Sequence, residues 1–203
     1  MNIISHVESY RSAPEDFVHV FQHDQLAAFV VADGAGGVGG GARAAQLVVR
    51  AFEDEIGGLS ASRATPEMWC EFLLRLDGQI ERDSDAGEST AVVVVVRDNE
   101  VVGASVGDSE AWVVVRDGNH EVLTSGQHKS RLGSGRANPV GFRATVANSV
   151  IIAATDGLFN YAPAEAIRSV LRATPTPENL VALARSRSGK LYDDVGLVIV
   201  SVA

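Results

Sequence analysis

Five aspartates stand next to apolar, strand-like segments of this sequence, and their carboxylates could bind a cation. They are Asp33, Asp108, Asp156, Asp193 and Asp194. A single aspartate at the end of a strand is usually part of a turn. Several of them can meet at one edge when their strands belong to one packed sheet, and there they would repel one another. Because a divalent cation would resolve that repulsion, the pattern predicts a metal site built from carboxylates.

The kind of metal follows from the ligands that the chain offers. Oxygen ligands without cysteine or paired histidine favour the hard ions Mg²⁺ and Mn²⁺ over zinc. Cys70 is the only cysteine, which excludes a disulfide framework and a cysteine-built zinc site. It lies in PEMWCEFLLRL, whose apolar residues recur at helical spacing. We therefore expect a helix residue rather than the nucleophile of a cysteine-dependent phosphatase.

The glycine-rich run after Asp33 supports a second hypothesis for the same stretch. Gly34, Gly36 and Gly39 fit the G-x-G-x-x-G pattern of dinucleotide-binding loops, directly between a strand and a helix. That fold needs an acid at the end of the next parallel strand, whereas Glu53 still lies inside the same helix. Asp33 would also repel a pyrophosphate at short range. The dinucleotide site is therefore the weaker hypothesis.

Composition indicates one domain without a polyanionic partner. The 203 residues are 46% hydrophobic, which is enough for one sizeable core, so 1–203 should form a single domain. With 17 basic and 26 acidic residues the formal charge is −9, which opposes broad attraction to nucleic acid or to an anionic membrane. The apolar runs are far shorter than the roughly 20 residues of a membrane helix, and residues 1–16 do not resemble a secretory signal. A cytoplasmic location is expected.

The apolar periodicity predicts groups of strands with pairs of helices between them. The expected strands are 15–23, 26–33, 89–97, 100–108, 110–116, 121–124, 149–155 and 195–202, and the expected helices are 41–56, 66–82, 163–172 and 177–187. The four strands between 89 and 124 are typical of one antiparallel meander. Such grouping predicts an α+β layered domain.

Residues 125–143 differ from the segments on either side of them, because they are basic, glycine-rich and irregular. They predict a mobile loop or a small flap. The basic residues there are Lys129, Arg131, Arg136 and Arg143. On charge alone, they could guide an acidic or phosphorylated partner.

Six segments of the chain match, in order, the motifs of a known family. They are RSAPEDFVHV (11–20), VADGAGG (31–37), GESTAVVVVV (87–96), SVGDSEAWVV (105–114), ATDGLFNY (154–161) and DDVGLVIV (193–200). On these motifs the chain resembles the metal-dependent serine/threonine protein phosphatases of the protein phosphatase 2C type, in the compact form found in bacteria. The resemblance covers nearly the whole chain. It implies a four-layer α-β-β-α sandwich, in which two antiparallel sheets pack face to face with helices on the outside.

The resemblance also implies a centre of two Mn²⁺ or Mg²⁺ ions at one edge of the sandwich. Asp33 would bridge the two ions, and the carbonyl of Gly34 would complete one coordination sphere. Asp156 and Asp193 would bind the other ion. Asp108 would join Asp156 at a third, weaker metal position.

Other residues take supporting roles by the same resemblance. Glu15 and Asp16 would hold metal-bound waters, as would Asp194. The chain has Asp194 where the family has asparagine, so it is open which residue of the pair binds metal directly, and Asp193 is favoured. Arg11, four residues before Glu15, would grip the substrate phosphate, because the guanidinium fork suits phosphate oxygens.

The implied function is hydrolysis of phosphoserine and phosphothreonine in protein substrates, in opposition to a serine/threonine kinase and hence in signal transduction. The two ions would lower the pKa of a bridging water enough to supply the attacking hydroxide, without a covalent phosphoenzyme. The alternative is a catalytically weak or inactive relative that binds phosphoproteins as a regulatory module. Degraded relatives usually lose a metal-binding aspartate, and none is missing here.

Three further positions depart from the family pattern. Ala35 stands where many eukaryotic members have a histidine that is proposed as the general acid, Pro14 stands where the family has asparagine before Glu15, and Asn160 stands where an aspartate is common. The first departure weakens the case for protonation of the leaving group by a side chain at that position.

Overall fold

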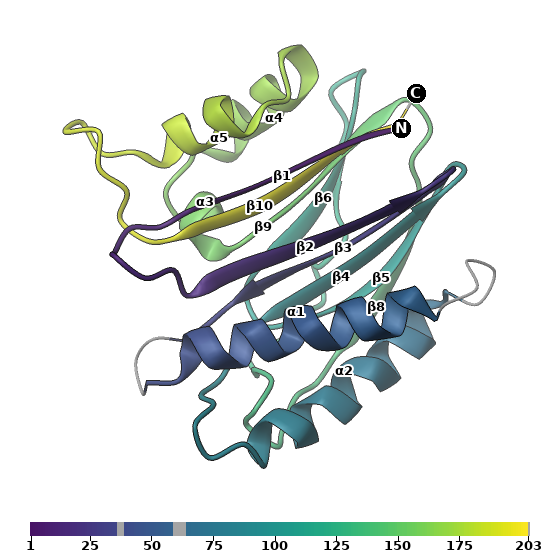
Figure 1. The fold of residues 1–203 in the computed structure, drawn as a ribbon. Coiled ribbons are helices and arrows are strands. Elements are labelled where there is room, and N and C mark those ends of the chain that lie inside the picture. Colours follow the sequence, from purple (N-terminus) through teal and green to yellow (C-terminus); the bar gives the residue numbers. More distant parts are fainter. Residues whose placement is uncertain (36–38, 59–63, 203) are drawn as a thin grey trace.

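Two antiparallel sheets with helices on both outer sides make up the computed structural model, which describes residues 1–35, 39–58 and 64–202 (Figure 1). The strands are β1 (Asn2–Glu8), β2 (Asp16–His23), β3 (Leu26–Asp33), β4 (Ala91–Arg97), β5 (Glu100–Val106), β6 (Glu110–Val115), β7 (His120–Val122), β8 (Val140–Thr145), β9 (Ser149–Ala154) and β10 (Val195–Ser201). One sheet has the strand order β1-β10-β9-β6-β7, and the other has the order β2-β3-β4-β5-β8.

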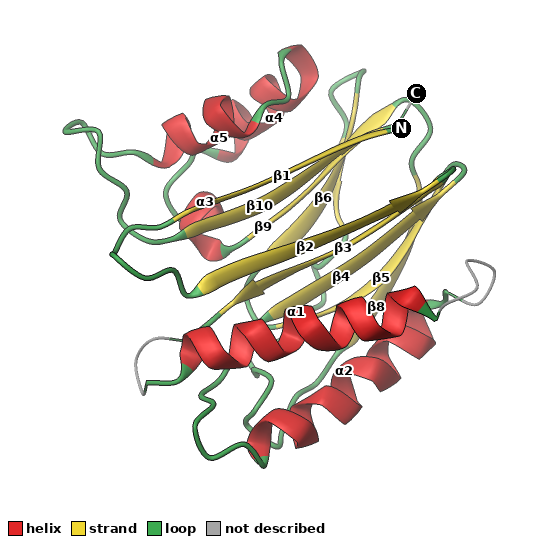
Figure 2. Cartoon of the chain, viewed as in Figure 1, coloured by secondary structure: helices red, strands yellow, loops and turns green. Residues whose placement is uncertain are grey.

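The helices form the two outer layers (Figure 2). They are α1 (Gly41–Gly57), α2 (Pro66–Glu81), α3 (Asp156–Phe159), α4 (Ala164–Ala173) and α5 (Pro177–Ala184). Helices α1 and α2 pack on the sheet that contains β3, and the other three pack on the sheet that contains β9. This arrangement confirms the predicted α-β-β-α sandwich. No helix within the described residues is long and apolar enough to cross a lipid bilayer.

The side chains of β4 show how one strand serves two apolar layers. Val92 and Val94 point into the core between the sheets, whereas Val93 and Val95 point towards α1 and α2. All four are buried. Because both faces of the sheet are covered, the strand is a continuous valine run and not an alternation of apolar and polar residues.

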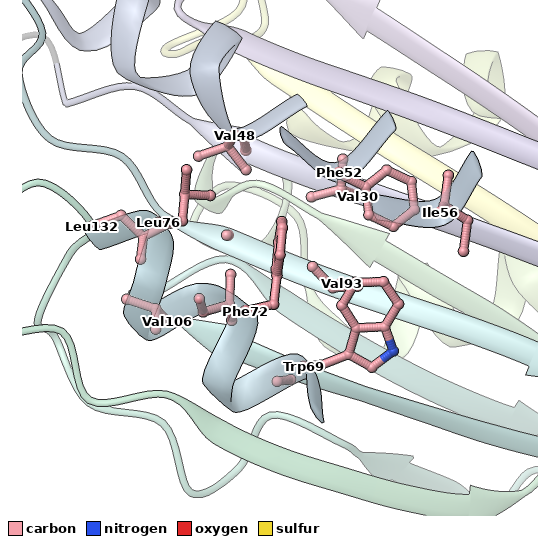
Figure 3. Packing of buried hydrophobic residues seen from close by; sticks show 14 of the residues in the cluster. Val30, Val48, Phe52, Ile56, Trp69, Phe72, Leu76, Val93, Val106 and Leu132 are labelled. Carbon is pink, nitrogen blue, oxygen red and sulfur yellow. The ribbon is translucent and has the colours of Figure 1, made fainter. Parts of the chain in front are cut away.

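Aromatic rings fix α1 and α2 on their sheet. The ring of Phe52 lies 5.8 Å from that of Trp69, and Trp69 meets Phe72 edge-on at 5.5 Å (Figure 3). Val30 and Val93 of the sheet belong to the same cluster. Burying a side chain such as Phe52 stabilises the fold by roughly 1.5–3 kcal/mol. Helix α1 follows Asp33 in the chain, so this packing also restrains the end of β3, where Asp33 lies.

The meander predicted between residues 89 and 124 is wrong in one respect. Strands β4 and β5 pair in one sheet, but the chain crosses over after β5, and β6 pairs with β9 in the other sheet. The crossover passes through Gly107, whose φ is +103°, and a side chain there would collide with Thr90. Hairpin-like spacing alone does not show that two strands belong to different sheets.

The other predicted strands and helices are confirmed to within three residues. Two strands and a short helix were missed, namely β1, β8 and α3. The short helix α3 has only four residues, so it shows no helical repeat. Strand β8 lies inside and beyond the segment expected to be a loop, and it forms an edge of its sheet.

Candidate active site

The ends of several strands lie at one edge of the sandwich, and the acidic residues lie with them. Asp33 is the last residue of β3, Asp108 follows β5, and Asp156 is the first residue of α3, after β9. Asp193 precedes β10. Asp16 begins β2 and stands directly opposite Asp33 in the antiparallel ladder. Antiparallel pairing puts the end of one strand beside the start of the next, which brings these distant residues together.

Asp33 lies at the electrostatic centre of this group. The pKa of Asp33 is raised to about 7, first by burial and then by the charges of Asp156, Asp108 and Asp193. The charge of Arg131 acts in the opposite direction. The pKa of Asp156 is also raised, first by burial and then by Asp108 and Asp193, while a hydrogen bond with Asp33 lowers it. The carboxyl groups of Asp33, Asp108, Asp156 and Asp193 are therefore electrostatic neighbours, and together they form the acidic group of the site.

Asp16 lies deeper than the other acids and joins the two sheets. Its side chain is 2% exposed, and its Oδ2 accepts a hydrogen bond from the backbone N–H of Gly196 on β10 at 2.9 Å. The pKa of Asp16 is raised to about 8, first by burial and then by the charge of Asp33, although a hydrogen bond with the side chain of Thr155 acts in the opposite direction. The carboxyl group thus fixes β2 to β10 beside Asp33.

Asp108 supplies the clearest sign that this group suits a cation. Its Oδ1 is buried and has no hydrogen-bond partner among the described residues, and its Oδ2 lies 3.6 Å from Nη2 of Arg131. A buried polar oxygen without a partner is unfavourable, and a bound cation would supply one. The oxygen donors of this group fit a hard divalent ion such as Mn²⁺ or Mg²⁺.

The acidic side chains do not already form a closed ligand cage. Within residues 1–35, 39–58 and 64–202, no three acidic, histidine or cysteine side chains are close enough to hold an ion as they stand. Repulsion between carboxylates acts over a longer range than metal ligation does, so the pKa shifts and this finding are compatible. Some of these side chains must turn towards one another before they share an ion.

Gly34 lies where the chain leaves β3 in very close contact with two other segments. Its N–H donates to the carbonyl of Glu15 at 3.0 Å. A Cβ atom on Gly34 would lie 2.4 Å from the backbone of Gly41 and 2.8 Å from the carbonyl oxygen of Glu15. Only glycine fits here, so the backbone beside Asp33 can approach the start of α1 and the residues before β2.

Asp193 and Asp194 have different surroundings, although they are adjacent. The side chain of Asp194 is buried, its Oδ1 accepts from the N–H of Tyr10 at 2.6 Å, and its Oδ2 accepts from the N–H of Glu15 at 2.8 Å. Asp193 is exposed, and its charge acts on Asp33 and Asp156. Asp194 therefore holds the loop between β1 and β2, while Asp193 belongs to the acidic group through its charge.

Arg11 lies on that loop and is exposed. Its guanidinium carbon is 5.8 Å from the centre of the Tyr10 ring. Among the described residues, the structure shows no hydrogen bond or ion pair of its guanidinium group. Arg11 is therefore near the acidic residues Glu15 and Asp16 in sequence, but its side chain is not held beside them.

Asp77 of α2 is a residue of the site that the sequence analysis did not identify. Its buried carboxylate accepts backbone hydrogen bonds from Gly133 at 2.7 Å, Gly135 at 3.2 Å and Ala137 at 3.0 Å. The same loop contains Arg131, which faces Asp108. The segment expected to be a mobile flap is thus held at these residues. A carboxylate on the apolar face of a predicted helix was the signal that could have revealed it.

Two contacts hold the end of α3: one joins it to the residues before β10, and the other lies within α3 itself. The rings of Tyr161 and Tyr192 stack with their centres 5.0 Å apart and 16° between their planes. Asn160, at the position where the family often has aspartate, donates from Nδ2 to Oδ2 of Asp156 at 2.9 Å. These contacts restrain Asp156 and the neighbour of Asp193 relative to each other.

The dinucleotide hypothesis is wrong, because the strands have the wrong direction. β3 and β4, on either side of the first helix pair, are antiparallel neighbours, whereas a dinucleotide fold needs parallel strands there. Gly36, one of the glycines of that pattern, lies outside the described residues.

Comparison with protein families gives one match that spans most of the chain. A family model described as "Protein phosphatase 2C" matches residues 6–178. No curated protein is significantly similar to this sequence.

Several solved structures have the same fold over the whole chain. A variant of a bacterial serine phosphatase is 22% identical, with a TM-score of 0.83 and coverage of 100% of this chain and 99% of the other. The serine/threonine phosphatase Stp1 from Staphylococcus aureus is 20% identical, with a TM-score of 0.81 and coverage of 100% and 94%. The catalytic domain of the serine/threonine protein phosphatase PstP, in complex with two manganese ions, is 20% identical, with a TM-score of 0.78 and coverage of 100% and 98%.

Proposed function

The chain belongs to the protein phosphatase 2C family, and from that premise we propose that it hydrolyses phosphoserine and phosphothreonine in protein substrates with Mn²⁺ or Mg²⁺. The observation that best supports this function is the meeting of Asp33, Asp108, Asp156 and Asp193 at one edge of the sandwich. The manganese ions in the PstP catalytic domain support the choice of metal. An enzyme of this kind would oppose a serine/threonine kinase in signalling.

The carboxyl groups and one backbone carbonyl are the proposed metal ligands. Asp33, the carbonyl of Gly34, Asp156 and Asp193 would hold two ions, and Asp108 would contribute to a third position. When bound, such ions lower the pKa of water and stabilise negative charge on the oxygens of a phosphoryl group. The buried, unpartnered oxygen of Asp108 supports its part in this set.

Asp33 and Asp156 must lose their protons before they can hold a cation. Burial and the charges of neighbouring carboxylates raise the pKa of both groups, and since that of Asp33 is about 7, a fraction of Asp33 is protonated near neutral pH. Ion binding would then release protons, and the affinity for metal would rise with pH across this range.

The loop between β1 and β2 is proposed to present the phosphate-binding side chain. Asp194 holds the backbone of this loop at Tyr10 and Glu15, while the guanidinium group of Arg11 stays free to turn. A guanidinium fork can bind two phosphate oxygens at once and offsets the charge of a dianion that approaches an acidic edge. Glu15 and Asp16 are proposed to accept hydrogen bonds from water beside the ions.

Hydrolysis of a small aryl phosphate tests the function. We expect turnover with Mn²⁺ or Mg²⁺, loss of turnover with chelator, and a large loss in Asp33→Asn and Asp156→Asn. Glu53→Gln is a matched control, since Glu53 is exposed on α1 and should leave the rate unchanged. A wild-type protein that is inert with both ions but still binds a phosphopeptide would instead be a regulatory binding module.

A further inference from the structure

The loop that follows β1 and the loop that precedes β10 run next to each other (Figure 1). A groove lies between them, beside the acidic group. One wall consists of residues 8–11, at the end of β1 and in the loop that follows it. The other wall consists of Arg185, Lys190 and Leu191, between α5 and β10. The two walls are joined by Arg185, whose Nη2 lies 2.7 Å from both carboxylate oxygens of Glu8.

The charge of this groove is opposite to that of the whole chain. Three cationic side chains, Arg11, Arg185 and Lys190, line it against the single carboxylate of Glu8, although the chain as a whole carries −9. Arg185 is occupied by Glu8 and by the carbonyl of Gly189. Arg11 and Lys190 form no ion pair with any described residue. Both are therefore available to a ligand, and the groove has an excess of positive charge.

The groove also leads directly to the acidic group. Leu191 is two residues before Asp193, which puts their Cα atoms at most about 7.6 Å apart. On the opposite wall, the N–H of Tyr10 donates to Oδ1 of Asp194. Arg11, the proposed phosphate-binding residue, is part of the groove lining. A chain whose phosphoresidue lies at the acidic group would thus extend its neighbouring residues into the groove.

We propose that this groove binds a second anionic group of the polypeptide substrate, close to the phosphoresidue, and that Lys190 is its main contact. This inference rests on the proposed function. A carboxylate and a second phosphate share the required chemistry, and we assign the groove to the carboxylate of an acidic side chain. A single exposed ammonium suits one carboxylate, while the exposed ring of Tyr10 offers apolar surface to the stem of that side chain.

Matched phosphopeptides test this assignment. A series of peptides carries one glutamate at each position on either side of a phosphothreonine. Each is compared with two matched peptides, in which glutamine or phosphoserine replaces that glutamate. At the position that reaches the groove, we expect the wild type to have a kcat/KM for the glutamate peptide roughly twofold to fivefold above that for glutamine, as exposed charge pairs give. Lys190→Gln should abolish this preference, and Lys190→Glu should reverse it.

Arg187→Gln is the matched control. Arg187 is exposed on the same loop and carries the same charge, but it does not line the groove. It should keep the glutamate preference, and all three variants should hydrolyse a small aryl phosphate at the wild-type rate, because that substrate has no group to place in the groove. A preference for phosphoserine over glutamate that Lys190→Gln also abolishes would contradict the assignment to carboxylate.

Two results would overturn the groove itself. The first is a wild type that does not distinguish glutamate from glutamine at any position. The second is an equal loss of preference in Lys190→Gln and Arg187→Gln, which would show that the overall positive charge of the loop, and not the groove, causes the preference. If the wild type hydrolyses no phosphate ester, the proposed function fails separately. Fluorescence anisotropy of the labelled peptides with the metal-free protein would then still decide whether Lys190 binds the acidic side chain.

Discussion

Asp156, at the start of α3, lies across the two sheets from Asp33, at the end of β3, and after burial its charge contributes most to the raised pKa of Asp33. Two partly buried carboxylates that are electrostatic neighbours repel each other, and a proton or a cation bound there relieves the repulsion. With its pKa raised to about 7, Asp33 keeps a proton below neutral pH in the metal-free protein, and we propose that a divalent ion takes the place of this proton in the active one.

The stability of the metal-free protein should fall as the pH rises. Asp16 and Asp33 have raised pKa values in the fold, about 8 and about 7, against an ordinary value near 3.8 when unfolded. Below pH 4 both states are protonated, and between pH 4 and 8 only the folded state keeps these protons, so each rise in pH favours unfolding. Thermal unfolding with chelator should therefore show a lower Tm at pH 8.5 than at pH 5.5, by about 2–4 °C for each kcal/mol lost.

Two comparisons separate this effect from the general repulsion of an acidic chain. Asp33→Asn should flatten the pH dependence, and Mn²⁺ should raise the Tm more at pH 8.5 than at pH 5.5. A Tm that stays constant over this range without metal would show that the carboxyl groups do not interact as described.

Asp194→Asn should loosen the loop between β1 and β2. Asparagine has one acceptor oxygen where Asp194 uses two, for Tyr10 and Glu15. We expect a loss of about 1–3 kcal/mol in the free energy of unfolding and a raised KM for phosphopeptides, because Arg11 lies on that loop. Urea unfolding and steady-state kinetics measure both, with Asp54→Asn, at an exposed position of α1, as the control. Complete loss of Mn²⁺ binding in Asp194→Asn would instead identify Asp194 as the direct ligand.

Asp77→Asn should release the loop at residues 133–137 from α2. Three backbone N–H groups donate to this buried carboxylate, and asparagine cannot accept all three in the same way. We expect a loss of about 1–3 kcal/mol in the free energy of unfolding and faster proteolytic cleavage in this loop. Glu71→Gln, at an exposed position of the same helix, should change neither. Equal cleavage of Asp77→Asn and wild type would mean that other contacts hold the loop.

Arg131→Gln should strengthen metal binding. The guanidinium group of Arg131 lies 3.6 Å from Asp108 and acts on Asp33 and Asp156, so its positive charge competes with an added cation. We expect Mn²⁺ to bind roughly fivefold more tightly, the factor that corresponds to about 1 kcal/mol of relieved repulsion. Calorimetric titration measures this, and Arg136→Gln, at an exposed position of the same segment, should leave the affinity unchanged. Weaker binding in Arg131→Gln would show that Arg131 orients Asp108 instead.

The positions of the acids could be predicted from sequence because each borders an apolar run that has to be a strand. Asp33 and Asp156 stand at strand ends, and the ends of packed strands share an edge. What the sequence does not contain is the choice of partners between strands. The crossover at Gly107 sends β6 to the second sheet, and the same spacing would suit a hairpin.

The supporting contacts could not be predicted, because they depend on backbone atoms that approach only in the fold. Asp194 binds N–H groups of Tyr10 and Glu15, and Asp77 binds N–H groups of a distant loop. An N–H group has no sequence signature, since every residue except proline carries one. An acidic residue on the apolar side of a predicted helix is the only clue to Asp77 in the sequence.

Calorimetric titration of Mn²⁺ into the wild type, Asp33→Asn, Asp156→Asn and the control Glu53→Gln tests the central claim most directly, because it measures whether these distant carboxylates share ions. We predict that the wild type and Glu53→Gln bind Mn²⁺ alike and release protons on binding, while each aspartate variant loses affinity by more than the roughly 10- to 100-fold that residues outside the ligand set contribute. Wild-type affinity in both aspartate variants would contradict the account.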